Sequence, residues 1–190
     1  HSFPTRRSSD LAMSYVRSRA DRFGIDKKQF EDFDIHLHFP ETSIPKDGPS
    51  AGLGMTLALV SALTRLPVKQ GIAITGEINL RGSAMIIGGL KEKAIGAHRA
   101  GIRTVIIPKA NERHIRDIPK KVRDELTIIP VEHMDQVLKL ALALDDPGSF
   151  LKEVVVPAPA ITPVAQTPTP TPPSSSTPPA PATPTPTAQA

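Results

Sequence analysis

The chain has no cysteine, no tryptophan and a single tyrosine. Without cysteine it can form no disulfide, no thiolate metal site and no cysteine nucleophile, and its composition fits a reducing compartment. It also has no apolar run long enough to span a bilayer, because its longest candidate, GLGMTLALVSAL, is interrupted by glycine, threonine and serine. We therefore expect a cytoplasmic protein with no membrane partner.

Charged residues are absent from the segment 154–190, which holds more than half of the chain's 21 prolines among threonine, alanine and serine. Such a composition has too few large apolar side chains to offset the entropy lost on ordering. We expect residues 147–190 to be a disordered tail, partly in the polyproline II conformation.

The net charge of +4 permits a nucleic-acid partner, but Lys and Arg are interleaved with Asp and Glu, and aromatics make up only 4% of the chain. A nucleic-acid partner is therefore not expected for this domain. The first residues, HSFPTRRSSDL, are basic without a following apolar signal core. They resemble a translated sequencing adapter, so we expect residues 1–11 to be non-native and disordered, with the native chain beginning further upstream.

Hydrophobic periodicity and turn residues predict alternating helices and strands. This alternation indicates one compact mixed α/β (α+β) domain over residues 12–146. The expected helices are 11–24, 50–64, 90–101 and 134–144, with shorter helical pieces at 111–118 and 119–126. The expected strands are 33–39, 71–78, 84–89, 104–108 and 126–131, with 71–78 and 84–89 forming a hairpin.

The stretch PKDGPSAG places Ser50 between two glycines and matches G-x-S-x-G, the nucleophile elbow of α/β-hydrolases. In that elbow an apolar strand runs directly into the turn, whereas here a polar, proline-containing loop intervenes. An esterase of this class also needs an acid and a histidine that converge on the serine. His98, His114 and His133 follow in the chain, but all lie in charged helical contexts, so the match indicates little by itself.

A Ser-Lys dyad is the alternative, with a neutral lysine amine as the general base. A lysine amine normally has a pKa of about 10.4 and is charged at neutral pH. A neutral amine therefore requires a lowered pKa, which desolvation among small, apolar neighbours can supply. The stretch GGLKEKAIGAHRAG offers such a helix face, but periodicity does not decide between Lys91 and Lys93. A carboxylate facing the amine would raise the pKa of the lysine, so we expect Glu92 to point elsewhere.

Ser50 stands at the expected start of a helix, where backbone N–H groups can stabilise an oxyanion. The simpler interpretation is that Ser50 is only an N-cap.

Taken together, PKDGPSAG, TGEINLRG and IGGLKEKAIGAHRAGI resemble the proteolytic (C-terminal) domain of bacterial Lon, the ATP-dependent protease also called endopeptidase La. The resemblance runs from about Ala12 to Leu142 and includes DIHLHFPE and TVIIPKAN. It implies a Lon-type proteolytic domain without its first strands, with Ser50 as nucleophile and Lys93, rather than Lys91, as base.

The resemblance also implies supporting residues. Thr75 occupies the position whose hydroxyl helps to hold the lysine amine, and Asp47 matches a loop acid linked to active and inactive loop conformations. Ala51, directly after the serine, is a further supporting position.

No metal site is expected. His36 and His38 could face one side of a strand, but no third ligand accompanies them, and the family has histidines here without a metal. No Walker A motif is present, so no cofactor is expected in this chain.

By resemblance, the working enzyme is a homohexamer that degrades misfolded and regulatory proteins, with ATP and Mg²⁺ in an AAA+ module that this fragment lacks. The alternatives are a non-catalytic Lon-like binding or assembly module and an α/β-hydrolase-type esterase.

Overall fold

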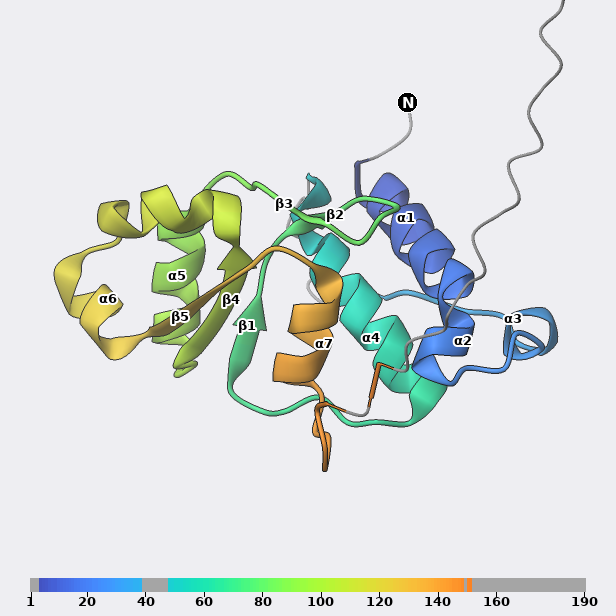
Figure 1. Ribbon diagram of the computed structural model, residues 1–190. Coiled ribbons are helices and arrows are strands. Elements are labelled where there is room, and N and C mark those ends of the chain that lie inside the picture. The colour runs from blue at the N-terminus through green and yellow to red at the C-terminus, as the bar shows by residue number, and fades with distance from the viewer. Residues whose placement is uncertain (1–3, 39–47, 149, 152–190) are drawn as a thin grey trace, which may run out of the picture. The chain divides into compact units, whose positions relative to one another are not determined.

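The computed structural model describes residues 4–38, 48–148 and 150–151 (Figure 1). A three-stranded parallel sheet in the order β1-β4-β5 lies at its centre. Its strands are β1 (Ile72–Ile74), β4 (Thr104–Pro108) and β5 (Thr127–Val131). They are rich in β-branched residues and form near-continuous apolar runs, as expected for strands covered on both faces.

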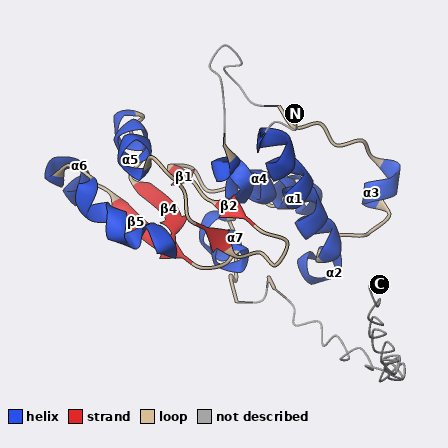
Figure 2. Cartoon of the chain, turned by 90° about the horizontal axis from the view of Figure 1, so that it is seen from above, coloured by secondary structure: helices blue, strands red, loops and turns tan. Residues whose placement is uncertain are grey.

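Side chains alternate across β4 and supply two separate cores. Ile106 is fully buried in the larger cluster, to which α1, α4 and α7 contribute. Val105 and Ile107 belong to the smaller cluster, with side chains of α5. Figure 2 shows α5 on the opposite side of the sheet from α1 and α4. The domain is therefore mixed α/β, which confirms the predicted fold class.

No helix among the described residues is long and apolar enough to cross a membrane.

The helices agree with the predicted ones in position more closely than in length. The α-helices are α1 (Pro4–Ser18), α2 (Ala20–Phe23), α3 (Gln29–Asp32), α4 (Gly52–Thr64), α5 (Leu90–Arg99), α6 (Lys120–Glu125) and α7 (Met134–Ala141). Two 3₁₀ segments accompany them, η1 (Pro49–Ala51) and η2 (Lys109–Asp117).

The helix expected over 11–24 differs at both ends. It begins at Pro4, inside the segment 1–11 for which we expected disorder, and Ser8 there is buried. It is also interrupted at Arg19, so that α2 forms a separate turn that ends at Gly24 in the left-handed conformation. Ala12 and Val16 of α1 pack into the larger core. The burial of Ser8 shows that the packed part of the helix extends before the periodic stretch.

The predicted strand 33–39 is wrong for its described part. Residues 33–38 have no assigned strand, because their backbone has no partner strand among the described residues. The alternation of burial persists nonetheless: Ile35 and Leu37 pack against the larger core, while His36 and His38 are exposed. A two-residue pattern thus fixes which side chains face inward, but a strand also needs a hydrogen-bonded neighbour.

The predicted hairpin is confirmed but is shorter than expected. Its strands are β2 (Glu77–Ile78) and β3 (Ala84–Met85), paired antiparallel. The expected strand 71–78 is divided at Thr75 and Gly76 between the parallel sheet and this hairpin. The division places Thr75 beside the start of α4, where Ser50 lies.

Candidate active site

A sharp turn places Ser50 in η1, directly before α4. Gly48 has φ of +128°, a conformation that residues with side chains rarely adopt, and Pro49 then begins η1. Gly76 N–H donates to the Ser50 carbonyl oxygen over 2.8 Å. The half-buried serine is therefore fixed between the helix start and the end of β1.

Lys93 lies one turn into α5. The helix buries Leu90, Ala94 and Ala97 in the smaller core, which leaves Lys93 on an adjoining exposed face. Its Nζ lies 3.0 Å from Ser50 Oγ and donates a hydrogen bond to it. The structure thus brings together two side chains that are 43 positions apart in the sequence.

The two other charged residues of GGLKEK lie away from the serine. Lys91 and Glu92 line a cavity of about 310 Å³ beside His114 and Asp117, whereas Lys93 lines the cavity that contains Ser50. Glu92 therefore lies away from the Lys93 amine, as expected, and Lys91 does not line the cavity that contains Ser50.

The cavity at Ser50 has a volume of about 470 Å³. Its lining is apolar apart from Ser50, Thr75 and Lys93, and it includes no carboxylate and no histidine among the described residues. The remaining lining residues are Ala51, Ala73, Ile74, Gly96, Ala97, Ala100, Ile102 and Val105. A side chain of moderate size, presented next to the serine, would be accommodated here.

Thr75 is nearly buried, with 8% of its surface exposed, and it lines this cavity. Its hydroxyl donates a long hydrogen bond of 3.5 Å to the Ser50 carbonyl oxygen. The family resemblance pairs this hydroxyl with the lysine amine. In the structure its partner is instead the backbone of the serine.

Lys93 is less enclosed than the sequence indicated. We expected desolvation among small neighbours, and Ala97 and Ala100 do line the same cavity, but the Lys93 side chain is exposed to solvent. The described residues therefore provide an apolar surface beside the amine but do not cover it.

The histidines do not complete a triad with Ser50. His98 Nε2 lies 2.8 Å from Glu125, and this hydrogen bond lowers the pKa of the Glu125 carboxyl. His114 lies 3.2 Å from the Asn111 side chain, and His133 Nε2 lies 2.9 Å from the Arg81 carbonyl. The geometry gives no support to an esterase of the α/β-hydrolase type.

Two further predictions concern Asp47 and the pair His36 and His38. Asp47 lies outside the described residues. His36 and His38 are exposed, and the described residues contain no group of three or more His, Cys, Asp or Glu that could hold a metal ion.

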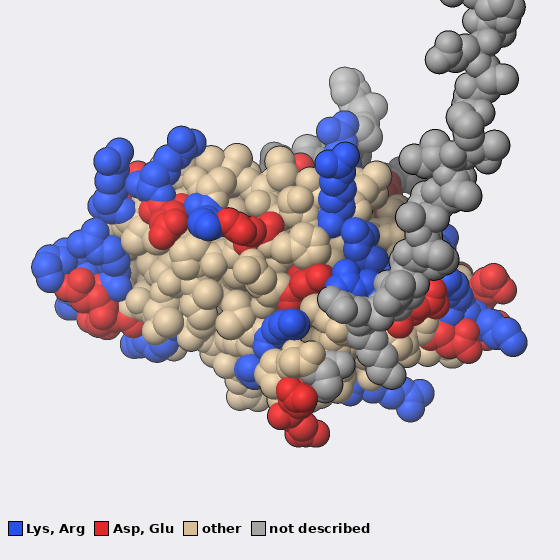
Figure 3. Space-filling view, viewed as in Figure 1, with Lys and Arg blue, Asp and Glu red and all other residues tan. Residues whose placement is uncertain are grey.

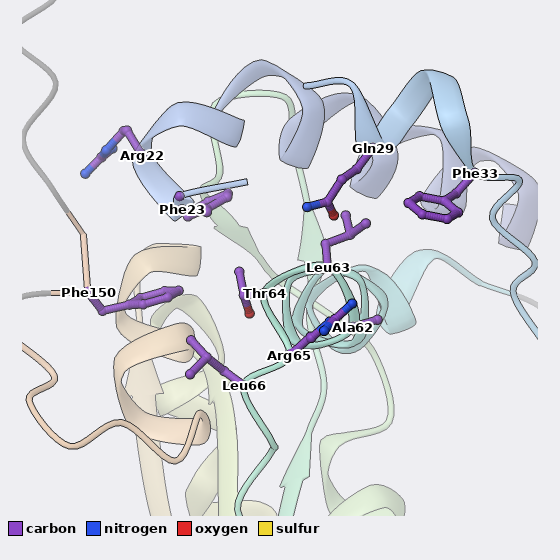
Figure 4. Close-up of a pocket in the computed structure, with 11 residues that line it drawn as sticks. Arg22, Phe23, Gln29, Phe33, Ala62, Leu63, Thr64, Arg65, Leu66 and Phe150 are labelled. Carbon is purple, nitrogen blue, oxygen red and sulfur yellow. The ribbon is translucent and has the colours of Figure 1, made fainter. Parts of the chain in front are cut away.

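A larger cavity lies elsewhere, with a volume of about 780 Å³ between α2, α3 and the end of α4 (Figure 4). Phe23 and Phe150 stack at its edge with ring centroids 6.4 Å apart. Arg22, also in its lining, is ion-paired with Asp135 over 3.3 Å. Its lining contains no pair of nucleophile and base, so its size does not make it the catalytic centre.

Gly76 is a residue that the sequence analysis missed. Its N–H holds the Ser50 carbonyl, and its own carbonyl accepts from Leu53 N–H over 3.0 Å, so it connects β1 to the first turn of α4. The motif TGEI drew attention only to Thr75. A glycine directly after a short apolar strand is the signal that could have marked a close backbone approach.

Charge on the surface is mixed. Figure 3 shows basic and acidic side chains side by side on the face drawn, without a continuous basic stripe. This distribution agrees with the interleaving of charges in the sequence.

Comparison with known proteins connects this geometry to a family. Residues 5–144 match the model of the Lon protease (S16) C-terminal proteolytic domain. The chain is 61% identical over 143 residues to Lon protease 1 of Myxococcus xanthus, which covers 75% of this chain and 18% of that protein. It is 57% identical over 143 residues to Lon protease of Brevibacillus choshinensis, with the same coverage.

Lon protease 1 of Bacillus subtilis is 56% identical over 137 residues, 72% of this chain and 18% of that protein. The chain thus spans about 18% of the length of these curated relatives. Because the family model covers well over half of its residues, the chain belongs to the Lon protease (S16) C-terminal proteolytic domain family.

Proposed function

We propose that this chain is a serine endopeptidase domain in which Ser50 is the nucleophile and Lys93 the general base. The observation that carries the proposal is the 3.0 Å contact between Lys93 Nζ and Ser50 Oγ beside an apolar cavity. A nucleophile within hydrogen-bond reach of a base, next to a space for a substrate side chain, is the minimum that acyl transfer requires.

In the first half-reaction, Ser50 Oγ attacks the carbonyl carbon of a peptide bond and its proton passes to the neutral amine of Lys93. The distance suits this transfer, since the hydroxyl can rotate to donate and the amine nitrogen then accepts. The resulting ammonium gives the proton to the departing amine, so the peptide bond breaks and an ester forms on Ser50.

In the second half-reaction, Lys93 takes a proton from water, which attacks the ester and releases the carboxylic acid. The proton then returns to Ser50 Oγ, which restores both residues. The oxyanion of each tetrahedral intermediate is assigned to the N–H of Ala51 at the helix start, because Gly52 N–H and Leu53 N–H already donate to Pro49 and Gly76 carbonyls.

Substrate binding supplies the desolvation that the described residues lack. A peptide side chain in the cavity would cover Ala97 and Ala100 and displace water from the neighbouring amine. Loss of water disfavours a charged ammonium and favours the neutral base. Occupation of the cavity would then accelerate peptide cleavage by favouring the neutral amine, which suits extended, unfolded polypeptide as substrate.

The remaining functions are assigned by family resemblance. We propose that ATP and Mg²⁺ act in a separate AAA+ module, that the working assembly is a homohexamer, and that it degrades misfolded and regulatory proteins in the cytoplasm. The chain itself carries no expected ATP site, so its own peptide cleavage should not respond to ATP.

A non-catalytic binding or assembly module is the second candidate, and the exposure of Lys93 favours it. Cleavage of a fluorogenic peptide and of carboxymethylated casein separates the two. If the domain is catalytic, the chain and its Lys91→Ala variant cleave both substrates, whereas Ser50→Ala and Lys93→Ala cleave neither. Equal residual cleavage in all four proteins would refute the dyad.

A further inference from the structure

Asn111 is a fully buried polar residue near the start of η2, outside the cavity that contains Ser50. Its side-chain oxygen Oδ1 accepts from Ile87 N–H over 3.0 Å, and its Nδ2 donates to the Ile87 carbonyl over 2.7 Å. One amide thus satisfies both backbone groups of one residue, as a neighbouring strand would. Only this orientation of the amide makes both bonds, so the contact is specific for asparagine.

Ile87 is a buried residue three positions before the start of α5. Two glycines follow it, and Gly89, with φ of +67°, is the N-cap of the helix but has no side chain to cap it. The Gly89 carbonyl then accepts from Lys93 N–H over 3.1 Å. The path from Asn111 to the backbone of Lys93 therefore consists of Ile87, the glycine pair and a single helical hydrogen bond.

The position of the Lys93 amine depends on this path. Its side chain is exposed, and within the described part of the chain Ser50 is its only hydrogen-bonding partner. No ion pair holds the amine from another direction among these residues. A shift of α5 at its N-terminal end would therefore be transmitted directly to the distance between Nζ and Oγ.

His114 completes the surroundings of the amide. Asn111 Nδ2 lies 3.2 Å from His114 Nδ1, which can accept a hydrogen bond when the ring is neutral with its proton on Nε2. Both hydrogens of the amide are thereby used, one by Ile87 and one by the imidazole. The buried group is fully satisfied, so it holds its geometry firmly.

We propose that Asn111 is a positioning residue for the proteolytic reaction: by clamping the backbone of Ile87 it fixes the start of α5 and so the distance of Lys93 from Ser50. The proposal rests on the proposed role of the dyad. Asn111 does not contact the substrate in this role. It affects the rate of the chemical step rather than substrate binding.

The first test is the rate at which a biotinylated fluorophosphonate labels Ser50 in the 190-residue chain. Asn111→Asp keeps the shape and the acceptor but replaces the donor by an oxygen that faces the Ile87 carbonyl. A misplaced base costs on the order of 10- to 100-fold in rate, which is the fall expected for this variant at about pH 8.5. With a cleavable peptide, kcat should fall and KM should remain within about two-fold of its original value.

A comparison of rates at two pH values separates a loss of positioning from a general disturbance of packing. Protonation gives the introduced carboxyl an O–H that can donate to Ile87, and burial raises the pKa of such a group. His114, the other titratable group at this amide, is replaced in both proteins by His114→Asn, which keeps an acceptor without a titrating ring. In that background the ratio of the Asn111→Asp rate to the rate with Asn111 should rise several-fold between about pH 8.5 and about pH 5.5. Ile118→Val, in the same small core, is the control, and its ratio should stay constant.

Amide hydrogen exchange in the unchanged chain provides a readout that needs neither a variant nor activity. If the clamp holds the start of α5, the amides of Ile87 and Lys93 exchange in one opening with similar protection. Much faster exchange at Ile87 overturns the proposal, as does labelling of folded Asn111→Asp within about two-fold of the unchanged chain. Absence of Ser50 labelling in the unchanged chain instead contradicts the proposed function, and the exchange data still decide on the clamp.

Discussion

Gly52 lies so close to Ile78 that a Cβ atom on Gly52 would come within 2.9 Å of the Ile78 backbone nitrogen and 3.0 Å of its Cγ2. The contact packs the first turn of α4 against β2. Because Ser50 is two residues before Gly52, this close approach helps to determine where the candidate nucleophile stands.

Gly52→Ala should therefore destabilise the domain, although alanine favours a helix. Overpacking against a backbone atom typically costs about 1–3 kcal/mol. Gly54→Ala, two residues further along α4, is the matched control, since a Cβ there meets nothing within 4 Å. The control should raise the free energy of unfolding by about 0.5–1 kcal/mol. Urea denaturation measures both, and equal effects of the two substitutions would show that the contact with Ile78 is unimportant.

Thr75→Val should slow the acylation of Ser50 while the domain stays folded. The change removes the hydroxyl that donates to the Ser50 carbonyl and lies in the same cavity as Lys93. Loss of one such hydrogen bond corresponds to about 0.5–1.5 kcal/mol, which is roughly a ten-fold fall in rate at the upper limit. Thr75→Ser keeps the hydroxyl and should retain most of the rate. If both variants react alike in fluorophosphonate labelling, the hydroxyl has no role.

Ala100→Leu should impair cleavage of peptides by filling the cavity beside Lys93 from its exposed edge. A change of one or more methylene groups in a substrate pocket alters kcat/KM by about 10-fold or more. Ala58→Leu, at an exposed position of α4, is the control for added surface hydrophobicity. A small fluorophosphonate, which does not need the cavity, should label all three proteins at similar rates. An unchanged kcat/KM in Ala100→Leu would place the substrate elsewhere.

Tyr15→Phe should reduce the fall in the free energy of unfolding at alkaline pH. Burial, together with the Asp135 carboxylate to which Tyr15 donates over 3.2 Å, raises the pKa of the Tyr15 hydroxyl. A tyrosine in the unfolded chain ionises near about pH 10, whereas the folded one still holds its proton there. The free energy of unfolding therefore falls as the pH rises above that value, by up to about 1.4 kcal/mol per pH unit from this group.

The substitution removes this contribution and also one hydrogen bond. Tyr15→Phe should thus be slightly less stable near neutral pH, and the two stability curves should converge above about pH 10. Parallel curves in chemical denaturation over this range would contradict the role of Tyr15.

The sequence predicted those parts of the fold that depend on local pattern. β4 and β5 each consist of β-branched residues with a single proline. α5 combines a periodic apolar face with flanking glycines. Both kinds of element were therefore predicted nearly to the residue. The prediction of a strand at 33–39 was wrong for its described part because pairing is a property of two segments. Alternation in one segment does not reveal whether a partner strand is present.

The candidate site was predictable only in part. Ser50 is conspicuous through its flanking glycines, whereas helical spacing left Lys91 and Lys93 equivalent until the family resemblance favoured Lys93. The structure separates them by placing Lys91 in a different cavity. The partners of Gly76 and Asn111 were not predictable, because each contact joins residues that are far apart in the sequence.

The proposed mechanism requires Lys93 to be the base for Ser50. The direct measurement is the second-order rate of fluorophosphonate labelling between about pH 6 and about pH 10, with the modified residue located by mass spectrometry. With Lys93 as the base, we expect an adduct on Ser50 and a fall in labelling rate of about 100-fold or more in Lys93→Ala, with Lys91→Ala close to the unchanged chain. An undiminished rate in Lys93→Ala, or an adduct on any residue other than Ser50, would contradict the proposed mechanism.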